Sequence, residues 1–381
     1  MKKLIFLLFF VILIVPNDSF AIENPLSVTN NKFGIHILFT NELQEAAKLV
    51  NSQGGDWGYV TIPIQAGDRD LEKWQKFMDG AKNLHVIPII RLATEGDYFN
   101  TKVWRKPKFE DVLDFANFLD SVKWPTKNRY IIVFNEVNRS DEWGGSSNPK
   151  EYAQILNYAV TVFKSKSQDF FIISAGLDNA SVNVPGTSFN EYDFMRKMND
   201  ETPGIFNQID GLSSHSYPNP AFSKPPTIHD QMSIASFKYE RELAKSLSTG
   251  KELPVFITET GWSKKRVSQD VVRSYYKIAF EDVWNNENVS AVTPFLLKAF
   301  AGPFTDFSFI KEDGQEDTQY KAIEDLPKVK GAPIIQQTVL GEDISKNMEF
   351  PTKNFSNEDS HPKFISKSKA LETIVKWLLK I

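Results

Sequence analysis

The sequence predicts an α/β fold, a (β/α)8 TIM barrel with an irregular C-terminal extension. Strand-like runs alternate with helical segments along most of the chain, which implies crossover connections and a parallel sheet. Eight such units fit in roughly 300 residues, near the usual size of such a barrel with insertions. No glycine-rich phosphate loop follows the first strand-like run, which weakens the alternative of an open dinucleotide-binding sheet.

The eight expected strands are rich in β-branched and aromatic residues. They cover residues 32–38, 57–64, 86–93, 129–137, 170–178, 211–217, 254–262 and 289–297. Two of them run apolar over four or five positions before a polar tip, the pattern of a strand buried on both faces.

Five intervening segments repeat apolar residues at intervals of three and four, which predicts amphipathic helices. They cover residues 71–84, 109–122, 151–165, 234–247 and 270–284. Ser268, just before the last of these segments, is a residue type that commonly starts a helix.

Two of the expected strands run directly into a glutamate. The segment IIVFNEVN (131–138) contains Glu136, and the segment PVFITETGW (254–262) contains Glu259. The carboxyl ends of all strands meet at one face of such a barrel, where active sites sit. Because the fourth and seventh strands lie across the barrel mouth from each other, their carboxylates can flank one scissile bond, as glycoside hydrolysis requires.

These residues also resemble a known family. The Asn135-Glu136 pair after the fourth strand, Glu259 in the context TETGW and the HSY run at 215–217 are similar to retaining glycosidases of glycoside hydrolase clan A, particularly families 5 and 39. The resemblance covers about residues 32–325. It implies that Glu136 is the general acid/base and Glu259 the nucleophile. It also implies that Asn135 binds the sugar 2-hydroxyl and that His215 or Tyr217 forms a hydrogen bond near the nucleophile.

Two positions depart from that family pattern. Many relatives have proline after the Asn-Glu pair, where this chain has Val137. Many also have a tryptophan at the end of the eighth strand, where this chain reads TPFLLKAF (293–300). Trp262 or Phe300 could supply the missing sugar platform.

The chemistry of a retaining pair follows from two carboxyl groups about 5 Å apart with different tasks. One must be protonated to assist the leaving group, and the other must be ionised to attack the anomeric carbon. An ionised Glu259 opposes ionisation of Glu136, and its conversion to a glycosyl ester removes that opposition. The reaction needs nothing else, so no cofactor is expected.

Other polar side chains near strand ends are weaker candidates. Arg91 could pair with Glu259 by a charge-assisted hydrogen bond or belong to a buried structural ion pair. His36 could reach a sugar hydroxyl or be satisfied inside the barrel. Competing carboxylates are Asp178, Glu95 and Asp141, for which a helix cap or a solvated loop is the favoured interpretation.

Aromatic side chains are abundant in segments that follow strands, and such rings can stack on sugars. They are Tyr98, Phe99, Trp104, Trp143, Trp262, Phe304 and Phe307. Loop packing is the favoured interpretation for the phenylalanines. Sugar contact is the prediction for Trp143 and Trp262.

Composition excludes several other functions. The net charge of -4 argues against a nucleic-acid partner. The chain has no cysteine, so it has no disulfide and no thiolate metal site. Its five histidines show no HExxH spacing, so no catalytic metal is expected.

The two ends of the chain differ from the barrel region, predicted over residues 22–326. Residues 1–21 combine Lys2 and Lys3, a short apolar run and a small-x-small ending, the pattern of a cleaved signal peptide, so we expect a secreted, cell-surface or periplasmic protein. Residues 327–368 are predicted to be an irregular linker. Residues 369–381 are predicted to form an amphipathic helix that docks on the barrel or contacts a membrane surface.

The sequence therefore predicts a secreted retaining glycoside hydrolase that acts on a β-linked glycan, with an oligo- or polysaccharide as its partner. The alternative is a carbohydrate-binding barrel without catalysis, which would have no need for two opposed glutamates. An isomerase or lyase on the same fold would require a metal cluster or phosphate site, for which the sequence has no pattern.

Overall fold

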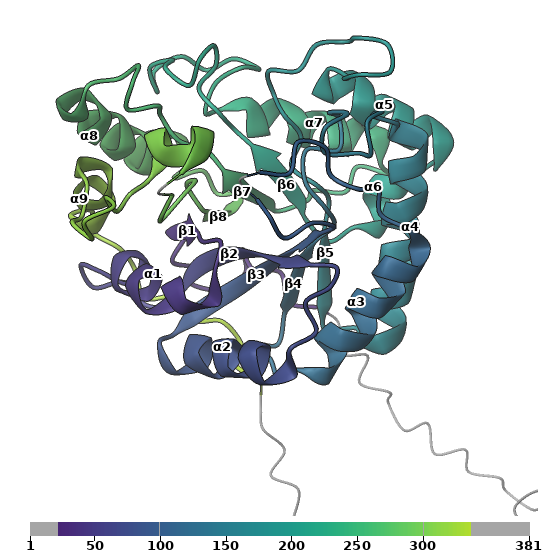
Figure 1. Ribbon diagram of the computed structural model, residues 1–381, viewed down its shortest axis with the longest axis horizontal. Coiled ribbons are helices and arrows are strands. Elements are labelled where there is room, and N and C mark those ends of the chain that lie inside the picture. The colour runs from purple at the N-terminus through teal and green to yellow at the C-terminus, as the bar shows by residue number, and fades with distance from the viewer. Residues whose placement is uncertain (1–21, 99, 300, 337–381) are drawn as a thin grey trace, which may run out of the picture. The chain divides into compact units, whose positions relative to one another are not determined.

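The computed structural model describes residues 22–336 except 99 and 300 (Figure 1). The predicted signal peptide, the predicted C-terminal helix and most of the predicted linker lie outside the described residues, as does the proposed platform residue Phe300. No helix among the described residues is long and apolar enough to cross a membrane.

All eight predicted strands are present. They are β1 (Gly34–His36), β2 (Gly58–Gln65), β3 (Val86–Ala93), β4 (Arg129–Ile132), β5 (Phe170–Ile173), β6 (Leu212–His215), β7 (Val255–Glu259) and β8 (Val289–Val292). The first five pair in chain order in one parallel sheet, and the last three pair in chain order in a second. This order is the one that a (β/α)8 barrel requires.

Bridges at two seams join the sheets into a closed barrel. Phe33 pairs with Val292, and the amide of His36 donates to the carbonyl oxygen of Pro294 at 3.0 Å, which connects β1 to β8. Ile173 pairs with Gly211 at the other seam, between β5 and β6. Closure removes the free sheet edges and points every strand's carboxyl end to the same face.

Helices surround the barrel on its outside (Figure 1). They are α1 (Leu43–Val50), α2 (Leu71–Asn83), α3 (Phe109–Ser121), α4 (Pro149–Lys166), α5 (Glu191–Glu201), α6 (Ile205–Gln208), α7 (Ser236–Leu247), α8 (Gln269–Ile278) and α9 (Thr318–Glu324). Helices α2, α3, α4, α7 and α8 are the five that the sequence predicts. A π-helical turn (Ala279–Val283) extends α8. Ser268 occupies the N-cap of α8, but its side chain makes no capping hydrogen bond.

The inside of the barrel is apolar near the amino ends of the strands and polar near their carboxyl ends. Tyr59, Tyr130, Phe171 and Phe256 belong to one buried aromatic and aliphatic cluster. Higher along the strands, the buried side chains include His36, Arg91 and Glu259. The apolar cluster fills the barrel beneath the polar side chains, which therefore lie toward the carboxyl face.

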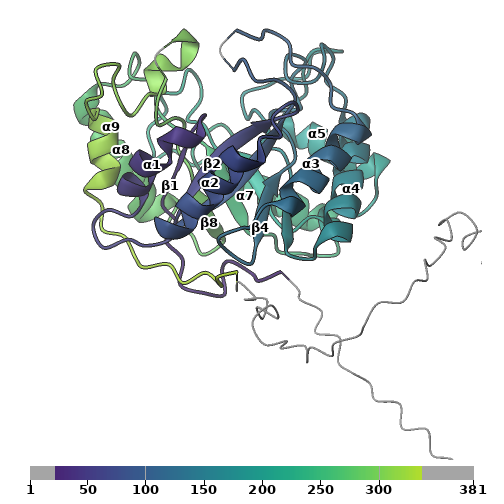
Figure 2. The ribbon, with the colours of Figure 1, turned by 60° about the horizontal axis from the view of Figure 1, so that its bottom comes forward.

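The two ends of the described chain lie together at the amino face of the barrel (Figure 2). The amide of Glu23 donates to Asn128, and Ile335 pairs with Thr126. Residues 327–336, the described part of the predicted linker, are irregular and run along this face. Both ends therefore lie away from the carboxyl face.

We expect Gly34→Ala to destabilise the barrel at the seam between β1 and β8. An added Cβ would lie 2.6 Å from Cγ2 of Thr293 and 2.9 Å from the carbonyl oxygens of Tyr59 and Val292. Because backbone surrounds the site, we expect the free energy of unfolding to fall by about 1–3 kcal/mol in chemical denaturation. Gly67→Ala is the control, since its Cβ would meet no atom within 4 Å. Equal stability of the two variants would contradict close approach at the seam.

Candidate active site

Glu136 lies in a strained turn rather than at a strand end. Strand β4 ends at Ile132, five residues before the predicted end at 137. The backbone then takes positive φ angles at Phe134 (70°) and Glu136 (35°), and the amide of Glu136 donates to the carbonyl oxygen of Gly176 at 3.0 Å. Positive φ costs free energy in residues other than glycine, so the turn is a specific device that directs the Glu136 side chain.

Glu259 is the last residue of β7, as the sequence predicts. Arg91, from β3 on the opposite side of the barrel, donates from Nη1 to Oε1 of Glu259. The hydroxyl of Tyr217 donates to Oε2 at 3.0 Å. Burial raises the pKa of Tyr217 well above its usual value, so this hydroxyl stays a donor. The Glu259 carboxylate is thus fixed from two sides.

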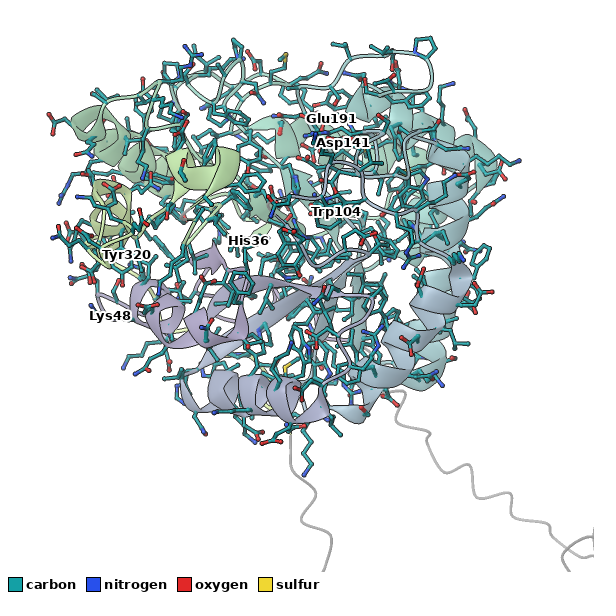
Figure 3. The ribbon with its side chains drawn as sticks, in the orientation of Figure 1. His36, Lys48, Trp104, Asp141, Glu191 and Tyr320 are labelled. Atoms are coloured by element: carbon teal, nitrogen blue, oxygen red, sulfur yellow. The ribbon has the colours of Figure 1, made fainter. Side chains whose placement is uncertain are left out.

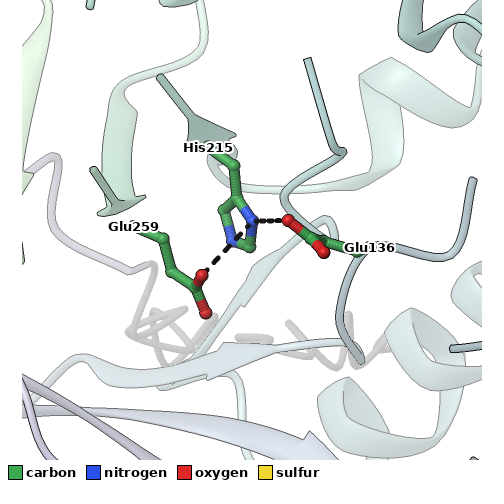
Figure 4. Close-up of side chains that lie close together, drawn as sticks. All are labelled: Glu136, His215 and Glu259. Carbon is green, nitrogen blue, oxygen red and sulfur yellow. Dashed lines mark hydrogen bonds and ion pairs between the residues drawn. The ribbon is translucent and has the colours of Figure 1, made fainter. Parts of the chain in front are cut away.

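His215 lies between the two glutamates (Figure 4). Its Nδ1 is 3.0 Å from Oε1 of Glu136 and 3.8 Å from Oε2 of Glu259. Oxygen atoms of the two carboxylates and the imidazole nitrogen all lie within 4.8 Å of one another. A Cβ at Gly176 would come within 2.1 Å of the imidazole, so only glycine permits this placement.

Charge around Glu136 favours its ionised form. Burial alone would raise the pKa of Glu136, but the guanidinium of Arg139 and the hydrogen bond from His215 outweigh it and hold this pKa below its usual value. Nη1 of Arg139 donates to Oε2 of Glu136 at 2.9 Å. Arg139 is fixed in turn by Asp141, which accepts from Nη2 at 2.6 Å and from Nε at 3.1 Å.

The two histidines near the pair have opposite protonation preferences. Burial lowers the pKa of His215, but the charges of Glu259 and Glu136 outweigh burial, so the pKa lies above its usual value. Burial and the charge of Arg91 lower the pKa of His36 well below its usual value. His215 therefore binds a proton more tightly than a free histidine does, whereas His36 is neutral.

A cleft of about 280 Å³ opens onto both glutamates. Its lining consists of Leu38, Arg91, Tyr98, Thr101, Lys102, Trp104, Asn135, Glu136, Arg139, Asp141, Glu142, Glu259, Phe295 and Phe304. Tyr98 and Trp104 stack with ring centroids 5.9 Å apart and form an aromatic wall. Trp104 and Asp141, labelled in Figure 3, belong to two loops on this side of the barrel. The cleft thus combines paired carboxylates with a flat apolar surface.

Asn135 lines the cleft beside Glu136. Its Oδ1 accepts from Nη1 of Arg91 at 2.7 Å, which turns the amide nitrogen toward other partners. That nitrogen has no hydrogen-bond partner within the part of the chain that the structure describes. It remains free for a ligand hydroxyl.

The structure corrects the predictions for two tryptophans. Trp143 and Trp262 are both 0% exposed. Trp143 packs edge-on against Tyr152, and Trp262 packs against Tyr276 and Trp284 and donates from Nε1 to the carbonyl oxygen of Lys224. Each loop turns its indole back into the layer between sheet and helices, so neither ring can contact a sugar here.

His36 is also buried, at 0% exposure, which corrects its predicted contact with a sugar hydroxyl. Its Nε2 lies 3.8 Å from Oε1 of Glu259, and neither ring nitrogen has a hydrogen-bond partner in the described residues. His36 therefore shapes the floor beneath Glu259.

The competing carboxylates have local partners. Asp141 pairs with Arg139, Asp178 lies 3.9 Å from the same guanidinium and accepts from the amide of Ala180, and Glu95 accepts from the amide of Arg105.

Sequence reasoning missed Arg139 and Glu142, which both line the cleft. The signal that could have found them is the dense run of charge in NRSDEW, directly after Glu136.

The glutamate pair and His215 form the described cluster with ligand atoms close enough for a metal ion. Both carboxylates are already bound by arginines, Glu259 by Arg91 and Glu136 by Arg139. Two fixed positive charges at these oxygens oppose a resident cation, so the site suits an organic substrate better.

Comparison with known proteins supports the fold. No family model matches this chain, and no curated protein sequence matches it. A family 39 glycoside hydrolase from Bacteroides cellulosilyticus is 17% identical over 80% of this chain and 64% of its own, with a TM-score of 0.56. A family 39 β-xylosidase from Caulobacter crescentus is 14% identical over 78% of this chain and 71% of its own, with a TM-score of 0.54.

A family 5 (subfamily 18) variant from Streptomyces cattleya, solved with Manβ1-4GlcNAc, is 13% identical over 78% of this chain and 80% of its own, with a TM-score of 0.52. The chain spans less than two thirds of the Bacteroides protein. This chain therefore has the (β/α)8 fold found in clan A glycoside hydrolases of families 39 and 5.

Proposed function

We propose that this protein is a retaining glycoside hydrolase that acts on a β-linked glycan, with Glu259 as nucleophile and Glu136 as general acid/base. The observation that carries the proposal is the opposition of the two carboxylates at one cleft, with oxygen atoms within 4.8 Å. Retaining enzymes hold their carboxyl groups about 5 Å apart, whereas inverting enzymes need about 6.5–9.5 Å to admit a water.

In the first step, an oxygen of Glu259 attacks the anomeric carbon and the bond to the leaving group breaks. Arg91 and Tyr217 hold this carboxylate in place through hydrogen bonds. Glu136 passes a proton to the departing oxygen, so the leaving group departs as a neutral alcohol. The product of this step is a glycosyl ester on Glu259.

In the second step, Glu136 takes a proton from water, and the water oxygen attacks the anomeric carbon of the ester. The Glu259 carboxylate leaves, and the sugar regains its original configuration after two inversions. The amide nitrogen of Asn135 is placed to donate to a hydroxyl beside the anomeric carbon, a contact that strengthens in the transition state of this reaction class.

The substrate class follows from the cleft lining and from the fold neighbours. The stacked Tyr98 and Trp104 rings offer a surface for the apolar face of a sugar. One neighbour is named a β-xylosidase and another was solved with a β-linked disaccharide, which supports a β-linked glycan. We also propose export to the cell surface or beyond, where such glycans occur, on the signal-peptide pattern of residues 1–21.

A non-catalytic sugar-binding barrel is the alternative. Two carboxylates at this distance repel each other, and a pure binding site gains nothing from them. Arg91 and Arg139 supply positive charge, and His215 a hydrogen bond, and these contacts keep both carboxylates in place. An arrangement that needs two arginines and a histidine to hold two carboxylates together favours catalysis over binding alone.

Glu259→Gln should abolish turnover and leave sugar binding intact. The amide keeps an oxygen that can accept from Arg91 but cannot attack carbon, so kcat on an aryl β-glycoside should fall by at least about a thousandfold. Glu110→Gln, an exposed carboxyl on α3, is the control and should match the wild type. Residual activity within tenfold of wild type would remove Glu259 from the nucleophile role.

Glu136→Ala should separate the two steps. With a good aryl leaving group, no acid is needed for departure, so the glycosyl-enzyme should form and then hydrolyse slowly. Added azide should restore turnover because it attacks without base assistance, and the glycosyl azide should have the configuration of the substrate. A product of inverted configuration, analysed by nuclear magnetic resonance, would contradict the retaining mechanism.

Trp104→Ala should weaken binding of a glycan without a matching loss of stability. Loss of a stacking surface should raise the dissociation constant on the order of tenfold, or about 1.4 kcal/mol, in calorimetric titration with the inactive Glu259→Gln protein. Trp262→Ala is the buried counterpart and should instead lower the free energy of unfolding by about 3–5 kcal/mol. If Trp262→Ala instead weakened glycan binding and left stability unchanged, Trp262 would belong to the sugar site.

A further inference from the structure

Glu136 lacks in the resting structure the proton that its acid role requires. Arg139 donates to its Oε2 at 2.9 Å, and His215 contacts its Oε1 at 3.0 Å. The positive charge of Arg139 and the hydrogen bond with His215 both favour the carboxylate over the acid. Because both carboxylates hold the proton of His215, the leaving group needs a proton from another group of the cleft.

Glu142 is the carboxyl best placed to hold that proton. It lines the same cleft as Glu136 and Glu259. Its neighbour Trp143 is fully buried, which fixes the loop on one side. Two backbone hydrogen bonds to Trp104 fix it on the other: the Trp104 amide donates to the Asp141 carbonyl oxygen at 2.7 Å, and the Gly144 amide donates to the Trp104 carbonyl oxygen at 2.8 Å.

The Glu142 carboxyl has no hydrogen-bond or ion-pair partner among the residues described, although its neighbour Asp141 is fully paired with Arg139. An ionised carboxylate in a half-buried site beside two other carboxylates would be costly without a cation. A protonated carboxyl avoids this cost and keeps an O–H group available for donation.

We propose that Glu142 is the proton reservoir of the active site, which supplies Glu136 with the proton that departs with the leaving group. This role rests on the proposed glycoside hydrolase function. In the resting site the proton is on Glu142, and Glu136 and Glu259 are carboxylates. During glycosylation the Glu142 O–H bond breaks, its proton passes through Glu136 to the leaving oxygen, and Glu259 loses its charge by forming the ester.

The charge balance of the cleft supports this assignment. Two carboxyl groups of the cleft are charged before glycosylation, Glu136 and Glu259, and two are charged afterwards, Glu136 and Glu142. Hydrolysis returns the proton, because Glu136 takes it from water and passes it back to Glu142 as the Glu259 carboxylate re-forms. The cleft therefore holds the same number of anions throughout the cycle.

Electrostatics of the surrounding groups agree. Burial and the charge of Glu136 raise the pKa of Glu142 to about 8, with Arg91 and Arg139 opposing and Asp141 adding to the rise. The other titratable side chains that line the cleft are Tyr98, Lys102 and Glu259. A neutral Glu142 is thus available at neutral pH, where Glu136 is ionised.

The variant Glu142→Gln distinguishes a proton-supplying role of Glu142 from a purely structural one. On a methyl β-glycoside, whose leaving group needs a proton, kcat/KM at neutral pH should fall about a hundredfold. On the 2,4-dinitrophenyl β-glycoside of the same sugar it should change less than about threefold, because that leaving group needs no proton. Equal losses on both substrates, or no loss on either, would overturn the proposal.

The pH profile gives the second readout. In the wild type, kcat/KM on the methyl glycoside should decline as the pH rises past about 8, where Glu142 loses its proton. In Glu142→Gln the acid must be Glu136 with its own proton, and the pKa of Glu136 is lowered, so the decline should move to acid pH. An unmoved decline would overturn the proposal.

A second substitution should reverse that shift. Arg139→Met removes the charge that lowers the pKa of Glu136, so in the Glu142→Gln background it should move the decline back toward alkaline pH. Glu142→Asp, which keeps a carboxyl, should retain more activity on the methyl glycoside than Glu142→Gln. Failure of both reversals would overturn the proposal. Glu110→Gln should match the wild type on both substrates.

The outcomes distinguish this inference from the proposed function. If the wild type turns over the substrate and Glu142→Gln has the same pH profile, Glu142 is not the proton reservoir. The glycosidase assignment is unaffected by that result. Absence of turnover by the wild type across a panel of aryl β-glycosides sinks both. Carbon-13 resonance of labelled glutamate carboxyls in the free protein tests the resting proton directly: a carboxyl that titrates near pH 8 should be lost in Glu142→Gln. Persistence of that signal would assign the proton to another glutamate.

Discussion

The site depends on holding two carboxylates within 4.8 Å of each other. At this separation their repulsion is roughly 3 kcal/mol for an effective dielectric near 20, a large fraction of the stability of a typical domain. Arg91, Arg139 and His215 offset this repulsion, and each comes from a different part of the barrel face. Barrel closure is therefore a condition for the chemistry, because an open sheet would separate these charges.

The backbone positions the site through residues that depart from regular strand geometry. Strand β4 stops early, and Glu136 adopts a positive φ that brings its amide to the carbonyl oxygen of Gly176. The same Gly176 leaves the space into which the His215 ring fits. One glycine thus serves both the acid/base turn and the imidazole that contacts it. Closely packed surroundings keep the strained turn in place, since relaxing it would break these contacts together.

Sequence patterns predicted the parts of this structure that local periodicity determines. All eight strands and five helices could be identified, and Glu259 follows from a strand that ends where the apolar run ends. The turn at Glu136 and its contact with Arg139 could not, because both depend on positive φ angles that no residue type in the segment requires. Sugar contact is the sequence prediction for Trp143 and Trp262, because both lie at or after a strand end. The position of a residue in a loop does not reveal the direction of its side chain. Burial of the large apolar area of an indole is favourable in free energy.

The residues that pack behind His215 include a glutamate, Glu240, whose protonation affects the stability of the folded protein. Ser214, which precedes His215, donates to Oε1 of Glu240 at 2.8 Å, and Glu240 lies beside the buried Glu191. Burial raises the pKa of Glu240 to about 7. Because this folded-state pKa exceeds its usual value, the folded protein holds the proton more tightly than the unfolded chain. The resulting stability is complete below the usual pKa of a glutamate and is lost as the pH rises through about 7. The folded protein is thus more stable when Glu240 is protonated, in the pH range where the proposed reservoir Glu142 also retains its proton.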